Sequence, residues 1–150
     1  MKTILKSNRT YGVEVEFIST VNQVTIANHL NNKFRGTDFR GESYNHATTP
    51  YWKITTDSSV RGQDQFGYGL EIVSPILKGK KGLKVMTKIM NEMEAMSEVS
   101  INMSCGIHVH VDVGTSTANQ IANCVKLYAK QSEYIDAILP VSRRLHGNKG

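Results

Sequence analysis

The chain has 150 residues, of which 39% are hydrophobic and 21% are charged. That length suits one domain, and the composition is globular, which excludes disorder as the default. No apolar run approaches the roughly 20 residues that a bilayer requires, and the charged start of the chain does not fit a signal peptide. Two cysteines make no disulfide framework. We therefore expect a single cytoplasmic domain over residues 1–150.

The 18 Lys and Arg residues exceed the 13 Asp and Glu residues, which gives a net charge of +5. A positive excess suits a polyanionic partner, although it more often reflects a solvated surface. The basic residues are scattered apart from one short cluster at Lys78, Lys80, Lys81 and Lys84. The sequence has neither the interleaved aromatic residues of a single-strand binder nor a recognition-helix signature. Nucleic acid is therefore not the expected partner.

The first predicted element is a strand over residues 11–18, where apolar and polar residues alternate strictly. Thr20 is a candidate N-cap for a helix over residues 21–32, which has a ragged apolar stripe. Residues 34–39 and 42–46 predict two short strands.

The middle of the chain predicts a strand over residues 52–57 that runs into a polar turn. A further strand over residues 69–74 is closed by Pro75. A helix follows over residues 80–98, because Leu, Ile and Met side chains recur there at spacings of three and four.

The last part of the chain begins with a strand over residues 107–113 that alternates as strictly as the first. Ser116 or Thr117 then opens a helix that reaches Leu139 and is stopped by Pro140. This order of elements predicts an α+β fold, with an antiparallel or mixed sheet and helices packed on one face.

The polar positions of three predicted strands carry acids and imidazoles. Successive residues of a strand point to opposite faces, so these side chains share the face turned away from the helices. A merely hydrated face would mix Thr, Ser, Gln and Lys, whereas no lysine interrupts this set. The set comprises Glu14, Glu16, Glu71, His108, His110 and Asp112.

Clustered carboxylates repel one another unless a cation binds among them. Glutamate oxygens together with an imidazole indicate Mg²⁺ or Mn²⁺ rather than a structural zinc. We therefore favour a metal site on this face over a hydrated surface.

Several motifs occur in a characteristic order and together cover nearly the whole chain. They are Tyr11-Gly12-Val13-Glu14-Val15-Glu16-Phe17, then Trp52 with Asp57-Ser58-Ser59-Val60, then Leu70-Glu71-Ile72-Val73-Ser74-Pro75, then Cys105-Gly106-Ile107-His108-Val109-His110-Val111-Asp112, then Ser142-Arg143-Arg144. In these motifs the chain resembles the amidoligase family, which belongs to the carboxylate–amine ligases that share the glutamine synthetase catalytic fold.

The resemblance implies a partial barrel of the glutamine synthetase type and ATP-dependent formation of an amide bond. ATP phosphorylates a carboxylate, and an amine then displaces phosphate from the acyl phosphate. Divalent metal ions, Mg²⁺ or Mn²⁺, bridge the nucleotide phosphates in such enzymes. The implied substrates are a small-molecule or peptide carboxylate and an amine.

The resemblance also assigns roles to individual residues. By position, Glu14, Glu16, Glu71 and His108 match metal ligands, and His110 matches a residue near the ATP phosphates. The implied catalytic residues are the four metal ligands together with Arg143. Arg143 and Arg144 could bind phosphate in a bidentate fashion. Asp57 and Ser59 match a polar turn at the substrate.

The chain is shorter than glutamine-synthetase-like ligases, so three interpretations are open: a minimal member, a fragment, or a relic that binds without turnover. A non-catalytic binder of a nucleotide, an acidic peptide or a protein is therefore one alternative. A metal-dependent hydrolase built on His108, His110 and Asp112 is a weaker one. An incomplete sheet would also leave an edge that a second subunit could complete.

Overall fold

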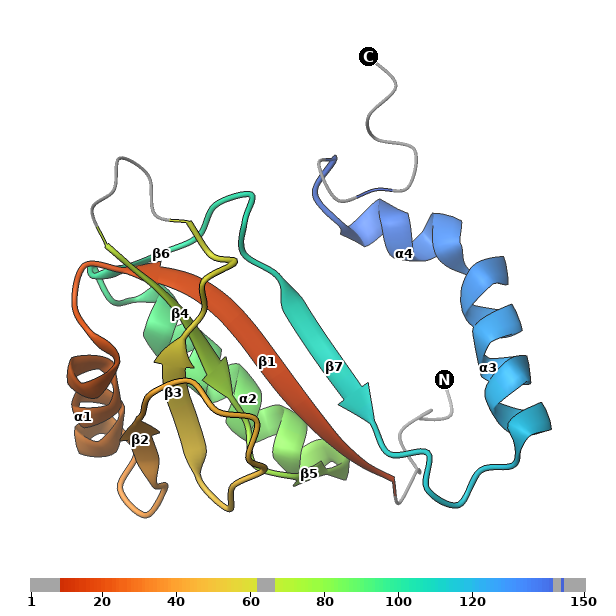
Figure 1. Ribbon diagram of the computed structural model, residues 1–150, viewed down its shortest axis with the longest axis horizontal. Helices are drawn as coiled ribbons and strands as arrows, with labels where there is room; N and C mark the ends of the chain where they lie inside the picture. Colours follow the sequence, from red (N-terminus) through yellow and green to blue (C-terminus); the bar gives the residue numbers. More distant parts are fainter. Residues whose placement is uncertain (1–8, 62–66, 142–143, 145–150) are drawn as a thin grey trace. The chain divides into compact units, whose positions relative to one another are not determined.

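The computed structural model describes residues 9–61, 67–141 and 144. The chain divides into two compact units, Met1–Asp112 and Val113–Gly150. Within the described residues, the first unit contains a sheet and two helices, and the second contains two helices (Figure 1).

The first unit is built on a seven-stranded mixed sheet that does not close into a barrel. The central strand β1 pairs with β4 and β5 along one edge and with β6 and β7 along the other. β2 pairs in parallel with β3, whereas the other pairs in the described part of the sheet are antiparallel. The strands are β1 (Thr10–Ser19), β2 (Phe39–Gly41), β3 (Trp52–Thr56), β4 (Tyr68–Val73), β5 (Leu77–Lys78), β6 (Val99–Ser100) and β7 (Ile107–Val111).

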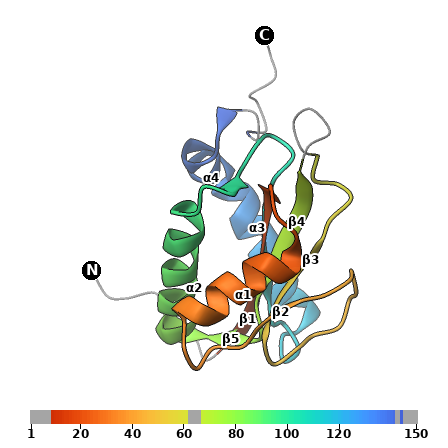
Figure 2. The same cartoon turned by 90° about the vertical axis from the view of Figure 1, so that its left-hand side faces the viewer.

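Two helices, α1 (Gln23–Lys33) and α2 (Gly79–Glu94), cover one face of this sheet (Figure 2). The apolar members of the alternating strands point to this face and pack with the helices in one core. The core residues from β1, β3 and β4 include Val13, Phe17, Ile54, Leu70 and Ile72, and those from the helices include Ile26, Leu30, Met86, Ile89 and Met93. The predicted α+β class and the predicted helix-covered face are confirmed for this unit.

The second unit contains α3 (Ala118–Lys130) and α4 (Ser132–Ile138). Thr117 caps α3 in a capping box, in which its side chain accepts from the backbone of Gln120 and the Gln120 side chain accepts in return. The single helix expected up to Leu139 is interrupted at Gln131, which leaves the helical conformation with φ −100° and ψ 5°. Whether these helices pack on the apolar face of the sheet stays a prediction.

Two predicted boundaries in the first unit are wrong. α1 is capped by Asn22, whose Oδ1 accepts from the Thr25 backbone N–H at 3.0 Å, and not by Thr20. The Thr20 N–H instead donates to the Glu98 carbonyl. α2 ends at Glu94 and not near residue 98, because Val99 and Ser100 pair with β1 as strand β6.

The two short strands expected around residues 34–46 reduce to β2, and residues 42–46 form a loop. Asn45 explains the change, because its side chain donates to the Ser43 carbonyl and accepts from the Ala47 N–H. Local side-chain bonds of this kind compete with a strand ladder.

No helix in the described parts of the chain is long and apolar enough to cross a membrane.

Candidate active site

The register of the sheet brings the predicted acids and histidines onto one face. Glu16 lies opposite Glu71 across β1 and β4, and Glu14 lies opposite His108 across β1 and β7. Directly opposed residues share a face, and so do residues two apart in one strand. His110 therefore joins the same face. The expectation that these side chains come together, away from the helices, is confirmed.

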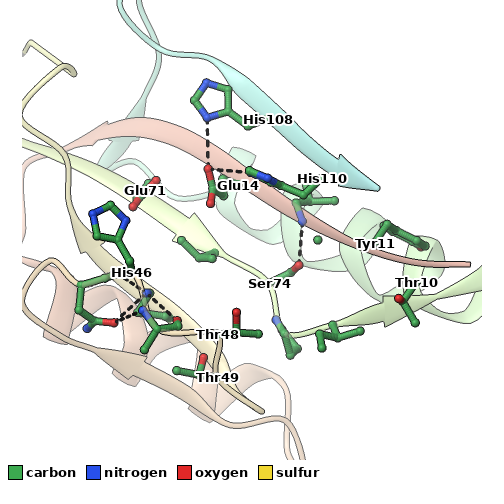
Figure 3. Close-up of a pocket in the computed structure, with 18 of the residues that line it drawn as sticks. Thr10, Tyr11, Glu14, His46, Thr48, Thr49, Glu71, Ser74, His108 and His110 are labelled. Atoms are coloured by element: carbon green, nitrogen blue, oxygen red, sulfur yellow. Dashed lines mark hydrogen bonds and ion pairs between the residues drawn. The ribbon is translucent and has the colours of Figure 1, made fainter. Parts of the chain in front are cut away.

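Glu14 lies between the two histidines of β7 (Figure 3). Its Oε2 is 3.2 Å from His108 Nδ1 and 3.3 Å from His110 Nε2. One carboxylate oxygen thus holds both imidazoles at the edge of the site.

Glu16 is buried, with 6% of its surface exposed. Its Oε2 accepts a 2.7 Å hydrogen bond from the Gly106 N–H, and its Oε1 lies 3.6 Å from His108 Nε2. A Cβ on residue 106 would lie 3.2 Å from the same Oε2, so glycine allows this close approach. Glu16 therefore fixes the start of β7 in addition to facing the site.

Glu71 is 8% exposed and has no hydrogen-bond partner in the described part of the chain. Burial, together with the charges of Glu14 and Asp57, raises the pKa of Glu71 to about 7. An adjacent cation would reverse this shift. The raised pKa reflects a carboxyl group that is withdrawn from water and placed near two other acids.

All of these side chains except Glu16 line a cavity of about 770 Å³ between the sheet and the loop that follows β2. Glu14, Glu71, His108 and His110 line its walls. Asp57 also lines the cavity.

The two residues of the predicted polar turn, Asp57 and Ser59, differ in their relation to the cavity. Ser59 is absent from the described lining of the cavity, but its N–H and its hydroxyl both donate to Asp57 Oδ1 at 2.7 Å. Ser59 therefore orients Asp57, and only Asp57 faces the cavity.

Lys53 also lines the cavity and was not anticipated. It lies opposite Val73, which in turn lies opposite Glu14, so a lysine does stand on the carboxylate face and the expectation of none is wrong. The side chain is 2% exposed. The alternation of Lys53 with apolar Trp52 and Ile54 was the signal that could have revealed it.

The Lys53 ammonium group holds the loop over the cavity. It donates to the carbonyl oxygens of Asn45 and Ala47 at 2.7 and 3.3 Å, and to Asn45 Oδ1 at 3.1 Å. These three acceptors match the three protons of an ammonium group. The loop also brings His46 to the cavity, a residue to which the sequence assigned no role.

A second set of contacts closes the ends of this loop. Tyr51 donates a 2.5 Å hydrogen bond to Glu42, which lowers the pKa of Glu42 and raises that of Tyr51. The Arg40 guanidinium lies 3.9 Å from the centre of the Tyr51 ring. The loop that covers the site is therefore anchored at its base and at its middle.

The predicted arginine pair lies in the second unit. Arg143 falls outside the described residues, and Arg144 Nε donates to the Leu139 carbonyl at 2.9 Å. Their part in a phosphate site stays a prediction.

Among the described residues, no three His, Cys, Asp or Glu side chains are arranged to hold a metal ion. The two nitrogens of His108 face different carboxylates, those of Glu14 and Glu16. Carboxylates and imidazoles pair with each other in this structure instead of converging on one point.

The fold and the site define an α+β protein with an open mixed sheet, one face of which is packed by helices and the other of which carries a cavity rich in carboxylates and histidines. The chain belongs to the family described as "putative amidoligase enzyme", which it matches over residues 7–148. Membership supports a ligase-type enzyme. No curated protein and no solved structure matches the chain.

Proposed function

We propose that this protein is an ATP- and Mg²⁺-dependent carboxylate–amine ligase that forms an amide or peptide bond through an acyl phosphate. Family membership supports the reaction class. The observation that carries the proposal is the row of carboxylates and imidazoles on β4, β1 and β7, set on one face by the strand register.

The residues present fit a divalent metal ion by their donor chemistry. Glu71 is buried without a partner, and oxygen ligands are those that Mg²⁺ prefers. Glu14, Glu16, Glu71 and His108 would hold the ion, or Mn²⁺ in its place. When bound, it would neutralise charge on the nucleotide phosphates.

The proposed reaction has two steps. A substrate carboxylate oxygen attacks the γ-phosphorus of ATP, and ADP leaves with the electron pair of the broken bond. An amine nitrogen then attacks the acyl carbon, loses a proton, and inorganic phosphate leaves. In this proposal His110 donates a hydrogen bond to a phosphate oxygen, and Asp57, held by Ser59, contacts the substrate; both residues line the cavity.

Thermal unfolding with and without Mg²⁺ and a non-hydrolysable ATP analogue tests the metal site. We expect the two ligands together to raise Tm, because they bind only the folded state, and Glu16→Gln to abolish the metal-dependent part of the rise. Glu94→Gln, at an exposed position of α2, is the matched control and should keep the full shift. An equal, metal-independent shift in wild type and Glu16→Gln would remove the metal site from the proposal.

The two histidines of β7 should separate by role. His108→Ala should weaken Mn²⁺ binding even without nucleotide. His110→Ala should leave the metal in place but weaken ATP binding by about 1–3 kcal/mol, the value of a hydrogen bond to a charged group. Calorimetric titration of both variants decides between these roles, and equal loss of metal in both would favour a His-x-His metal clamp.

A metal-dependent hydrolase is the second candidate, because His46 joins His108 and His110 on the cavity wall. Elemental analysis for zinc tests it. Release of phosphate that depends on ATP and on an added amine would separate the ligase from the hydrolase and from a non-catalytic binder.

A further inference from the structure

Five lysines gather over the segment that runs from β5 to the middle of α2. The chain has no acidic residue between Glu71 and Glu92, and these lysines fall within that stretch. The 18 basic residues less these five leave 13, equal to the 13 acidic residues, so the segment accounts for the whole net charge of +5. The lysines are Lys78, Lys80, Lys81, Lys84 and Lys88.

All five side chains are exposed, and none has an ion-pair partner among the residues that the structure describes. The opposite side of α2 packs into the core through Met86, Ile89 and Met93. The four lysines of α2 therefore point away from the core, and Lys78 continues this basic surface onto β5.

The position of two of these lysines is unfavourable for the helix. Lys80 and Lys81 lie in the first turn of α2, which has no acidic residue and no side-chain cap at Lys78. The helix macrodipole favours anions at that end and disfavours cations. Residues that break a local rule without a compensating contact are expected at functional positions.

Lys80, Lys84 and Lys88 follow one another at i, i+4 and i+8, and we call them the lysine row. Their spacing along the helix is about 6 Å per step. In an extended peptide, side chains on one side recur about every 6.5–7 Å. The lysine row therefore matches a strand-like peptide that carries an acidic residue at every second position.

The basic surface begins at the edge of the cavity. Lys78 lies opposite Thr10 in the pairing of β5 with β1, and both Thr10 and Ile76 line the cavity. Cα atoms of opposed residues in an antiparallel pair are about 5 Å apart. Lys78 therefore lies between the rim of the cavity and the start of the lysine row, so a peptide that extends beyond the row at its Lys80 end would run toward the cavity.

We propose that the lysine row docks an acidic peptide and that this peptide is the carboxylate substrate. The assignment as substrate rests on the ligase function proposed above, whereas the docking site does not depend on it. Lysine ammonium groups attract carboxylates as point charges, so recognition depends on charge spacing more than on side-chain shape.

A fluorescein-labelled peptide of alternating Glu and Ala tests the docking site by anisotropy, without ATP or metal. The variant Lys84→Gln with Lys88→Gln removes two charges from the row at i and i+4. The variant Lys126→Gln with Lys130→Gln removes two charges at the same spacing from exposed positions of α3 and is the matched control.

We expect the wild-type protein to bind the peptide in a salt-dependent manner, and the row variant to bind about five- to tenfold more weakly. The control should change less than about twofold, since it leaves the row intact. Equal weakening in both variants, or none in the row variant, would overturn the proposal. An oligonucleotide of the same charge that binds more tightly through the row would also overturn it, in favour of a nucleic-acid site.

Turnover then tests whether the docked peptide is a substrate. With ATP, Mg²⁺ and hydroxylamine as the amine, the row variant should raise KM for the peptide and leave kcat unchanged. Peptide binding that depends on the row without phosphate release in any variant would retain the docking site and reject the ligase function. Phosphate release with free glutamate but not with the peptide would overturn the substrate assignment.

Discussion

The two faces of the central sheet are made by alternate residues of the same strands. The apolar side chains of one face are fully packed, whereas some polar side chains of the other face lack hydrogen-bond partners in the described part of the chain. On the helix-covered face, Phe17, Ile54 and Ile72 are at most 1% exposed and pack in one core. On the other face, Thr55 is fully buried and Glu71 is 8% exposed, and both side chains lack hydrogen-bond partners among the described residues. A buried polar group without a partner costs free energy, so the second face is organised for something other than stability.

The largest effect is expected from the packed face. Phe17→Ala should lower the free energy of unfolding by about 3–5 kcal/mol, through lost burial and the cavity left behind. Urea denaturation measures this, with Glu14→Gln on the opposite face of the same strand as control. A loss below about 1 kcal/mol would mean that the two faces do not differ in packing as described.

Lys53 is the one buried cation on the cavity face of the described sheet, and its loss should loosen the covering loop. Lys53→Met should cost about 1–3 kcal/mol, because the carbonyl groups of Asn45 and Ala47 lose a charged donor. Hydrogen exchange should accelerate at residues 44–49. Lys33→Met, at an exposed ion pair on α1, should leave that exchange unchanged. Unaltered protection of the loop in Lys53→Met would contradict this role.

Glu71 should make the metal-free protein less stable as pH rises. Its folded-state pKa of about 7 lies above the unfolded value of 4.5, so the folded state holds the proton more tightly between these values. Stability falls from pH 4.5 to 7 and stays low above that range. Glu71→Gln should therefore stabilise by about 1–3 kcal/mol at pH 8.5 and change little near pH 4.

Glu42 should show the opposite pH dependence of stability, measured for both variants by urea denaturation at several pH values. The hydrogen bond from Tyr51 lowers the pKa of Glu42, so its contribution is present at neutral pH and is lost as pH falls through the folded-state value. Glu42→Gln should thus destabilise at neutral pH. The same pH dependence in both variants would show that burial is not what distinguishes Glu71.

The smallest effect is expected at Thr55, which lies opposite Glu71 and whose hydroxyl has no partner in the described part of the chain. Thr55→Val keeps the shape and removes the unsatisfied group, so we expect a gain of about 1 kcal/mol. Thr56→Val, at the exposed neighbouring position, should change stability by less than about 0.5 kcal/mol. A loss of stability in Thr55→Val would indicate a hydrogen bond through ordered water.

Alternation along single strands was sufficient to predict much of this protein. The strands that became β1, β3, β4 and β7 were placed from their period of two, and the same period assigned Glu14, Glu16, Glu71 and the histidines to one face. Local rules carry this information because a pleated strand turns successive side chains to opposite sides whatever it pairs with. The family followed from the motifs on those strands.

Only the tertiary structure decided what these side chains touch. Register placed Glu16 opposite Glu71 and Lys53 two strands from Glu14, and a loop distant in sequence supplied the acceptors for Lys53. The two-residue strands β5 and β6 are too short to leave a periodic signal. Hydrogen bonds, burial and charge pairing depend on which distant segments meet, because the free energy of each group is set by its neighbours in space and not by its neighbours along the chain.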